Sequence, residues 1–126
     1  MADNDAEHKN MIGHFLGMEL YVVTSTLAGD PEKMRENMKS HLAHQVEIEK
    51  KGILFAAGPM YAEGGEVPRA GMIIIRAESF QEAERIAQSD PMHKSGARTF
   101  AIDKWVVNEG GFNLRVTYSD QKAEIS

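Results

Sequence analysis

The stretch "MIIIRAESFQEAERIAQSDP" (72–91) combines the strongest strand signal in the chain with a helix that follows directly. Residues 72–78 open with Met and three Ile, a run typical of a buried strand. Ser79 and Glu82 match the capping box that begins many helices. The apolar residues of the predicted helix share one face: Phe80, Ala83, Ile86 and Ala87. The stretch therefore predicts a strand that leads into an amphipathic helix and ends near an Asp-Pro pair.

A second, longer helix is predicted from Pro31 to about Lys51. Asp30 is placed to be its N-cap, and Pro31 fills the first helical position, where a missing N–H costs nothing. Gly52 suits the left-handed residue that often follows a helix. The sequence thus marks both ends of this helix.

Three further strands are predicted around the helices. They are "GMELYVVTSTL" (17–27), "ILFAAG" (53–58) and "RTFAIDKWVVN" (98–108), with Gly58-Pro59 ending the second. Residues 90–97 are predicted to form a turn or short helix. The order β-α-β-β-α-β is that of a ferredoxin-like fold of the α+β class. It predicts a four-stranded antiparallel sheet with two helices on one face.

The sheet face without helices is predicted to be covered by a second copy of the chain. "YVVT", "FAA" and "MIII" are apolar at consecutive positions, so both faces of the sheet should be buried. A single chain would leave a large apolar patch in water. We therefore expect a homodimer, or an assembly of dimers, whose sheets pack face to face into an α/β barrel.

The chain is predicted to be one domain at residues 18–108, with an N-terminal extension at 1–17 and a C-terminal arm at 109–126. The opening "MADNDAEHKN" is expected to be a solvated tail. The arm alternates apolar residues and could be an extra edge strand or an arm that reaches a partner: Phe112, Leu114, Val116 and Tyr118.

Composition argues against several classes of partner. The 126 residues carry a net charge of -5, and the 14 Lys and Arg residues form no basic run, so nucleic acid is not expected as a partner. No apolar stretch reaches transmembrane length, and the start lacks the order of a secretory signal. The absence of Cys removes disulfides and thiolate chemistry and fits the cytoplasm.

Two residues are candidates for catalysis. His41 lies near the centre of the apolar stripe of the long helix, with Gln45 one turn further and His44 on the flank. A buried imidazole needs partners for both ring nitrogens, or it faces a cavity. Asp90 ends the second helix, where it could simply cap the next turn. Since the two helices lie side by side, Asp90 could also orient His41 as a general base. His41 as an ordinary core histidine remains the alternative.

Other residues carry weaker hypotheses. His41, His44, His93 and Asp90 have spacings from which a metal site can be drawn, but no established metal motif supports one. Gly58 and Pro59 are predicted to shape a cleft and to leave backbone N–H groups free for an oxyanion. Substrate contacts are predicted for Tyr61, Arg69 and His93, which could equally be exposed loop residues.

Several of these segments together resemble the YciI-like (YCII-related) family over about residues 18–108. The matching elements, in order, are the helix bearing "HL", then "GILFAAGPM", "GMIIIRAESFQEAERIAQSDP" and "ARTFAIDKWVV". The resemblance implies a dimeric ferredoxin-like α/β barrel in which His41 and Asp90 form the family's His-Asp pair in a cleft. One branch of the family is a dehydrochlorinase that acts on a chlorinated hydroxyhydroquinone, and related folds include muconolactone isomerases. The N-terminal extension, the 61–71 loop, His44, His93 and the C-terminal arm depart from the family's short members.

The expected function is that of a small-molecule lyase or isomerase of cyclic or aromatic intermediates. His41 would remove or relay a proton, and Asp90 would hold and polarise the imidazole. Such chemistry demands no cofactor. The alternative is a non-catalytic dimeric module that binds a ligand or serves as an accessory protein.

Overall fold

The computed structural model describes residue 7, residues 10–11 and residues 13–126. The chain divides into two compact units, one of Glu19–Val106 and one of Met1–Met18 with Val107–Ser126. Most of the predicted solvated tail lies outside the described residues.

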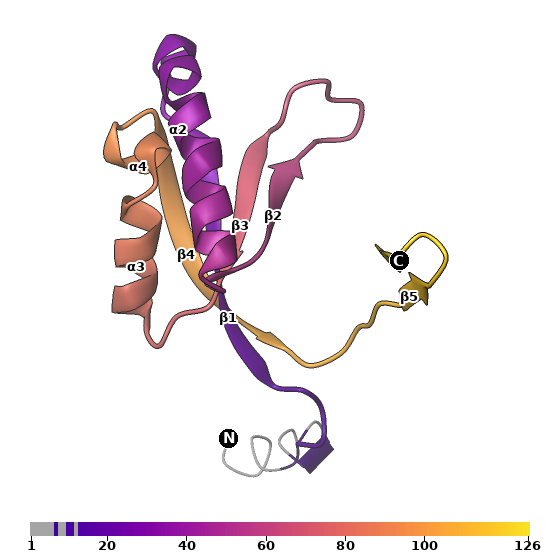
Figure 1. The fold of residues 1–126 in the computed structure, drawn as a ribbon. Coiled ribbons are helices and arrows are strands. Elements are labelled where there is room, and N and C mark those ends of the chain that lie inside the picture. Colours follow the sequence, from indigo (N-terminus) through magenta and orange to yellow (C-terminus); the bar gives the residue numbers. More distant parts are fainter. Residues whose placement is uncertain (1–6, 8–9, 12) are drawn as a thin grey trace. The chain divides into compact units, whose positions relative to one another are not determined.

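The unit Glu19–Val106 has the predicted ferredoxin-like order (Figure 1). Its sheet has the strand order β2-β3-β1-β4, with β3 antiparallel to both β1 and β2. The α+β class and the four-stranded sheet with helices packed on it are confirmed. The elements are β1 (Met18–Leu27), α2 (Pro31–Lys50), β2 (Leu54–Met60), β3 (Ala70–Ile75), α3 (Phe80–Gln88), α4 (Pro91–Lys94) and β4 (Arg98–Val107).

Short polar contacts fix the starts of the two long helices. The Asp30 carboxylate accepts a hydrogen bond of 3.0 Å from the Glu32 N–H, so Asp30 is the N-cap of α2. The Ser79 hydroxyl accepts a bond of 3.1 Å from the Glu82 N–H at the start of α3. The Glu82 carboxylate reaches back to the N–H of Glu78, one residue before the usual target of a capping box. Both helix starts therefore lie where the sequence predicts them.

The core lies between the helices and one face of the sheet. The register pairs Tyr21 with Ile75 and Val23 with Ile73, which places these four side chains on the same face. They form one buried cluster with residues of both helices: Ile48, Ala83 and Ala87. Burial of each large aliphatic side chain stabilises the fold by about 1.5–3 kcal/mol. This packing holds α2 and α3 on a common face of the sheet.

The opposite face of the sheet is apolar and open in the single chain. Val22 and Ile74 are paired in register, as are Thr24 and Met72. They line a shallow hollow of about 470 Å³ together with Asp103, Lys104 and Trp105. Trp105 is 41% exposed there. This is the surface on which a homodimer was predicted, and the dimer stays a prediction.

The second strand extends further than its sequence indicates. Gly58-Pro59 was expected to end it, but β2 continues to Met60, which pairs with Ala70. The reason is that β2 is an edge strand, where a proline needs no N–H for the ladder. At the end of β2, the Arg69 N–H donates a hydrogen bond of 2.8 Å to the Met60 carbonyl.

The second unit contains a hairpin of β5 (Leu114–Thr117) and β6 (Lys122–Ile125) (Figure 1). The two strands form a sheet of their own, so the C-terminal arm is not an extra edge strand of the main sheet. Its register gives one apolar and one polar face: Leu114, Val116, Ala123 and Ile125 against Arg115, Thr117, Lys122 and Glu124.

Across the described part of the chain, no helix has the length and apolar character needed to cross a bilayer.

Candidate functional site

His41 and Asp90 meet, although 49 residues separate them in the sequence. The His41 Nδ1 lies 2.9 Å from Oδ1 and 2.8 Å from Oδ2 of Asp90. The Asp90 side chain is 3% exposed, whereas that of His41 is 19% exposed. The pair joins α2 to the turn between α3 and α4. The carboxylate is therefore buried while the imidazole keeps some contact with solvent.

Asp90 both caps a helix and holds the imidazole. It is the N-cap of α4, with Pro91 after it, and its Oδ1 accepts a bond of 2.9 Å from the Met92 N–H. Burial by itself would raise the pKa of Asp90. The hydrogen bonds from His41 and Met92, and the nearby imidazoles of His41 and His93, outweigh burial and lower the pKa below its ordinary value. The Asp90 side chain is thus held in place, and its lowered pKa favours the ionised form.

The hydrogen bond sets the tautomer of His41. A carboxylate can only accept, so Nδ1 carries the proton that points at Asp90. Neutral His41 then has its lone pair on Nε2, and no described residue is hydrogen-bonded to that atom. This is the arrangement of a general base, in which one nitrogen is held and the other is free to take a proton.

His93 lies behind the pair in a closed network. It is 5% exposed, and its Nδ1 lies 2.7 Å from the carbonyl oxygen of Ala87. A carbonyl can only accept, so Nδ1–H donates and Nε2 accepts from the Ser25 hydroxyl at 2.7 Å. Burial lowers the pKa of His93. Its predicted contact with substrate stays untested, and its surroundings favour a positioning role.

The network continues to Arg98, at the start of β4. Its Nε donates to the Ser25 hydroxyl at 2.9 Å, and Nη2 donates to the Ser25 carbonyl at 2.7 Å. Its Nη1 lies 3.6 Å from the sulfur of Met34 on α2. The guanidinium is partly buried, which lowers its pKa. Arg98 is therefore held rigidly between β1 and α2.

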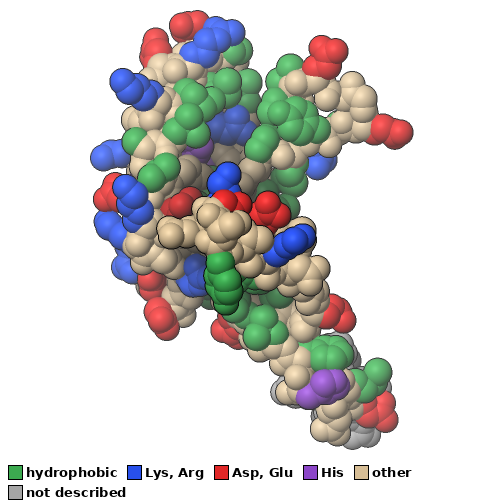
Figure 2. All heavy atoms as spheres, turned by 45° about the vertical axis from the view of Figure 1, so that its right-hand side comes forward, with side chains coloured by type: hydrophobic (Ala, Val, Ile, Leu, Met, Phe, Trp, Pro, Cys, Tyr) green, Lys and Arg blue, Asp and Glu red, His purple; other side chains and the backbone are tan. Residues whose placement is uncertain are grey.

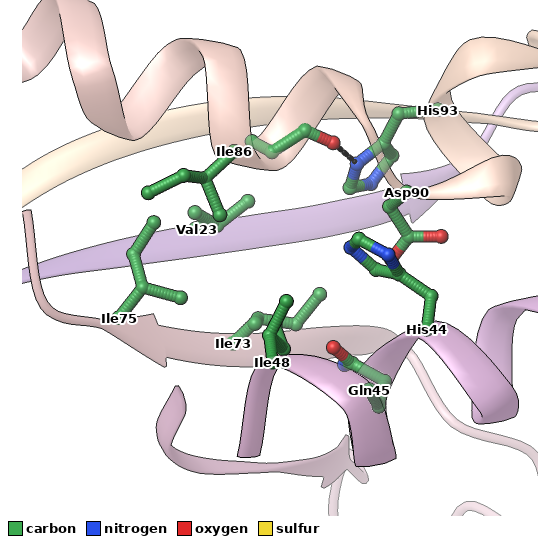
Figure 3. A pocket seen from close by; sticks show the side chains of 10 residues that line it. Val23, His44, Gln45, Ile48, Ile73, Ile75, Ile86, Asp90 and His93 are labelled. Atoms are coloured by element: carbon green, nitrogen blue, oxygen red, sulfur yellow. Dashed lines mark hydrogen bonds between the residues drawn. The ribbon is translucent and has the colours of Figure 1, made fainter. Parts of the chain in front are cut away.

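A small cavity adjoins Asp90 on the inner side (Figure 3). Its volume of about 10 Å³ has room for about one water molecule, so it cannot hold a ring. His44 and Gln45 line it. The Gln45 Oε1 is a buried side-chain atom without a hydrogen-bond partner among the described residues. A substrate must approach His41 from its exposed side.

The other residues that were predicted to contact the substrate lie on β2 and in the loop that follows it. Gly58 and Pro59 are on β2, while Tyr61 and Arg69 are in the loop between β2 and β3, and all four are exposed. None of the hydrogen bonds of the described residues joins them to His41 or Asp90. Figure 2 shows a hollow in the surface, with a histidine and a basic side chain visible at its floor and hydrophobic side chains on both flanks. Contact of these four residues with substrate stays a prediction.

Sequence reasoning missed Ser25 and Arg98 as members of the site. Ser25 continues the alternation of Tyr21 and Val23 on the core face, and a polar residue at such a position needs a buried partner. Among the described residues, no three His, Asp or Glu side chains gather in a way that could hold an ion. No simple sequence signal identifies Arg98.

Comparisons with known proteins agree with this fold. The family model of the YCII-related domain matches residues 15–106. A similar solved structure is 5-chloro-2-hydroxyhydroquinone dehydrochlorinase from Burkholderia phenoliruptrix AC1100, in complex with 2,5-dihydroxybenzoquinone. It has a TM-score of 0.57 and 20% identity, covering 70% of this chain and 93% of that chain, and at this identity the likeness shows the fold alone. No curated protein matches the chain. The match to the family model covers most of the sequence, and the chain belongs to the YCII-related family.

Proposed function

We propose that this protein is a small-molecule lyase in which His41 acts as the general base and Asp90 holds it. The observation that carries the proposal is the contact of 2.8–2.9 Å between the His41 Nδ1 and a buried carboxylate. An orienting carboxylate and a partly exposed imidazole are what proton transfer to a bound molecule requires. The same pair could serve an isomerase if the proton returned to another atom of the substrate.

In the proposed reaction, the Nε2 of His41 is the atom that accepts the proton. Nε2 takes a proton from a phenolic oxygen or from a ring carbon activated by a carbonyl group. The imidazolium that forms is stabilised by the buried charge of Asp90. The electron pair left behind moves into the ring, and a leaving group such as chloride departs with the pair of its own bond. General base catalysis of this kind contributes about 10²–10⁴-fold to a rate.

The similar solved structure guides the choice of substrate. That protein is a dehydrochlorinase of 5-chloro-2-hydroxyhydroquinone, and its structure holds a dihydroxybenzoquinone. We propose a substrate of the same class, a small ring with hydroxyl or carbonyl groups and a leaving group. Loops and arms shape the entrance of a pocket, so the 61–71 loop gives this chain scope for a different ring.

We further propose that the active form is a cytoplasmic homodimer. The open apolar face of the sheet, lined by Val22, Met72, Ile74 and Trp105, is the surface that the second copy covers. A patch of this kind on a single chain is typical of an interaction surface. The two sheets then close into the barrel expected from the sequence.

Release of chloride from 5-chloro-2-hydroxyhydroquinone tests the proposed reaction. Wild type should release chloride at a rate proportional to enzyme concentration. His41→Ala should lower the rate at least about 10²-fold with an unchanged circular dichroism spectrum. His14→Ala removes an exposed imidazole from the other unit and should leave the rate unchanged.

Full activity of the His41→Ala variant would end the proposal. Tight binding of the dihydroxybenzoquinone without any turnover, across chlorinated, hydrated and unsaturated rings of this class, would favour the non-catalytic binding module instead.

A further inference from the structure

We propose that Arg98 binds an anionic group of the ligand, a carboxylate or an ionised ring hydroxyl, while His41 contacts the reacting end. The inference rests on the proposed function in placing the ligand against His41. It adds to that function a recognition residue and a substrate class, a small cyclic anion.

The guanidinium of Arg98 is oriented by contacts that leave part of it free. An arginine has five N–H donors. Nε uses its single donor on the Ser25 hydroxyl, and Nη2 uses one of two on the Ser25 carbonyl. Nη1 points one donor at the Met34 sulfur, which is a weak acceptor at 3.6 Å. Each terminal nitrogen therefore has an uncommitted N–H, and a carboxylate can accept from two such donors at once.

The positive charge of Arg98 is not matched by a carboxylate of its own. The ion pairs found among the described residues do not include it. Asp90 is near enough to act on Arg98 electrostatically, but its oxygens are bound to His41 and to the Met92 N–H. A partly buried charge without a partner is costly, and an anionic ligand supplies the partner.

The Ser25 hydroxyl and the His93 imidazole hold the Arg98 side chain in place. The donor and acceptor roles in this network follow from the Ala87 carbonyl, which can only accept a hydrogen bond from His93. His93 then accepts from the Ser25 hydroxyl, whose oxygen is left to accept from Arg98. The chain of bonds prevents the guanidinium from turning toward solvent. A preorganised donor of this kind binds an anion with less loss of side-chain entropy.

Arg98 contacts the same helix that carries His41. Met34, which contacts Arg98, and His41 are two turns apart on one face of α2. A small cyclic anion lying along this face can therefore meet Arg98 with its charged group and His41 with its reacting end. The exposed apolar side chains of Met38 and Leu42 on the same helix provide a surface for such a ring.

Two probes that differ in charge test the inference: 2,5-dihydroxybenzoate and its neutral amide, 2,5-dihydroxybenzamide. Dissociation constants are measured by calorimetry for wild type, Arg98→Met, Arg98→Lys and Arg35→Met. Wild type should bind the anion at least about 10-fold more tightly than the amide, the value of one charge-assisted hydrogen bond. Arg98→Met should lower this ratio to about one. Arg35→Met makes the same change of net charge at an exposed helix position and should keep the wild-type ratio.

Three results would overturn the inference: an unchanged ratio in Arg98→Met, equal affinities of wild type for the two probes, or binding of neither probe. If Arg98→Met does not fold, Arg98→Lys decides. Lysine keeps the positive charge but cannot form the bidentate contact. The ratio of its affinities for the anion and the amide should therefore be at least about threefold lower than that of wild type. Binding is measured without turnover, so failure of the chloride assay and failure of this test are distinguishable.

Discussion

The buried neutral His93 makes the stability of the fold depend on pH, and His93→Gln tests this. In the native state its Nδ1–H is held by the Ala87 carbonyl, and its Nε2 is occupied by the Ser25 hydroxyl. A second proton on Nε2 would face an oxygen that already accepts from Arg98. Burial, the largest cause, lowers the pKa of His93 in the folded state. Between that lowered pKa and the unfolded value of about 6.5, the unfolded chain binds the extra proton.

The magnitude follows from linkage. Because the unfolded state takes up more protons in this window, stability is fully present above about pH 6.5 and falls as the pH is lowered. At pH 5.5 the unfolded histidine is stabilised by at most about 1.4 kcal/mol relative to a native His93 that stays neutral. The pKa of Asp90 is also lowered, but its contribution is lost only below about pH 4, outside this range.

Urea unfolding at pH 7.5 and pH 5.5, at one protein concentration, measures the effect. Glutamine keeps one donor for Ala87 and one acceptor for Ser25 but does not titrate. The loss of unfolding free energy between the two pH values should be smaller in His93→Gln than in wild type, by up to about 1.4 kcal/mol. Comparing the losses cancels the other titrating groups and any constant effect of the substitution. Equal losses in both proteins would refute the closed network around His93.

Three more substitutions test separate parts of the structure. Asp30→Ala should lower the unfolding free energy by about 1 kcal/mol in urea melts, since the Glu32 N–H loses its cap, and no change would contradict that role. Gln45→Met should raise it by about 1 kcal/mol, because it removes a buried acceptor that no described donor pairs with; a loss of stability would show that Oε1 has a partner. Trp105→Lys should convert the proposed homodimer into monomers in sedimentation experiments, and a dimer of unchanged affinity would place the interface elsewhere.

Local signals in the sequence account for most of the fold. The Asp30 and Ser79 side chains begin the helices because each accepts from an N–H group two or three residues further on, and Pro31 fits the first helical position because no N–H is needed there. Ile73 and Ile75 belong to the buried core, as an apolar run predicts, whereas Ile74 faces the open side of the sheet. The end of β2 could not be predicted from Pro59, since only the sheet topology shows that β2 is an edge strand.

The site was predictable only where helix geometry determines it. The spacing of the apolar stripe indicates that His41 faces inward, and the Asp90-Pro91 pair indicates where α3 ends. The network joins Ser25 on β1 to His93 and Arg98, which lie 68 and 73 residues later in the sequence, so its hydrogen bonds depend on the tertiary fold.

The protonation of the His41 ring is the most direct test of the proposed base. Nitrogen-15 NMR of the protein distinguishes a proton on Nδ1 from one on Nε2 in the neutral imidazole. The contact with Asp90 requires that Nδ1 carry the proton, although a free imidazole side chain in water favours Nε2, and that Asp90→Ala abolish this preference. A neutral His41 with its proton on Nε2 in wild type would contradict the pairing and the proton transfer derived from it.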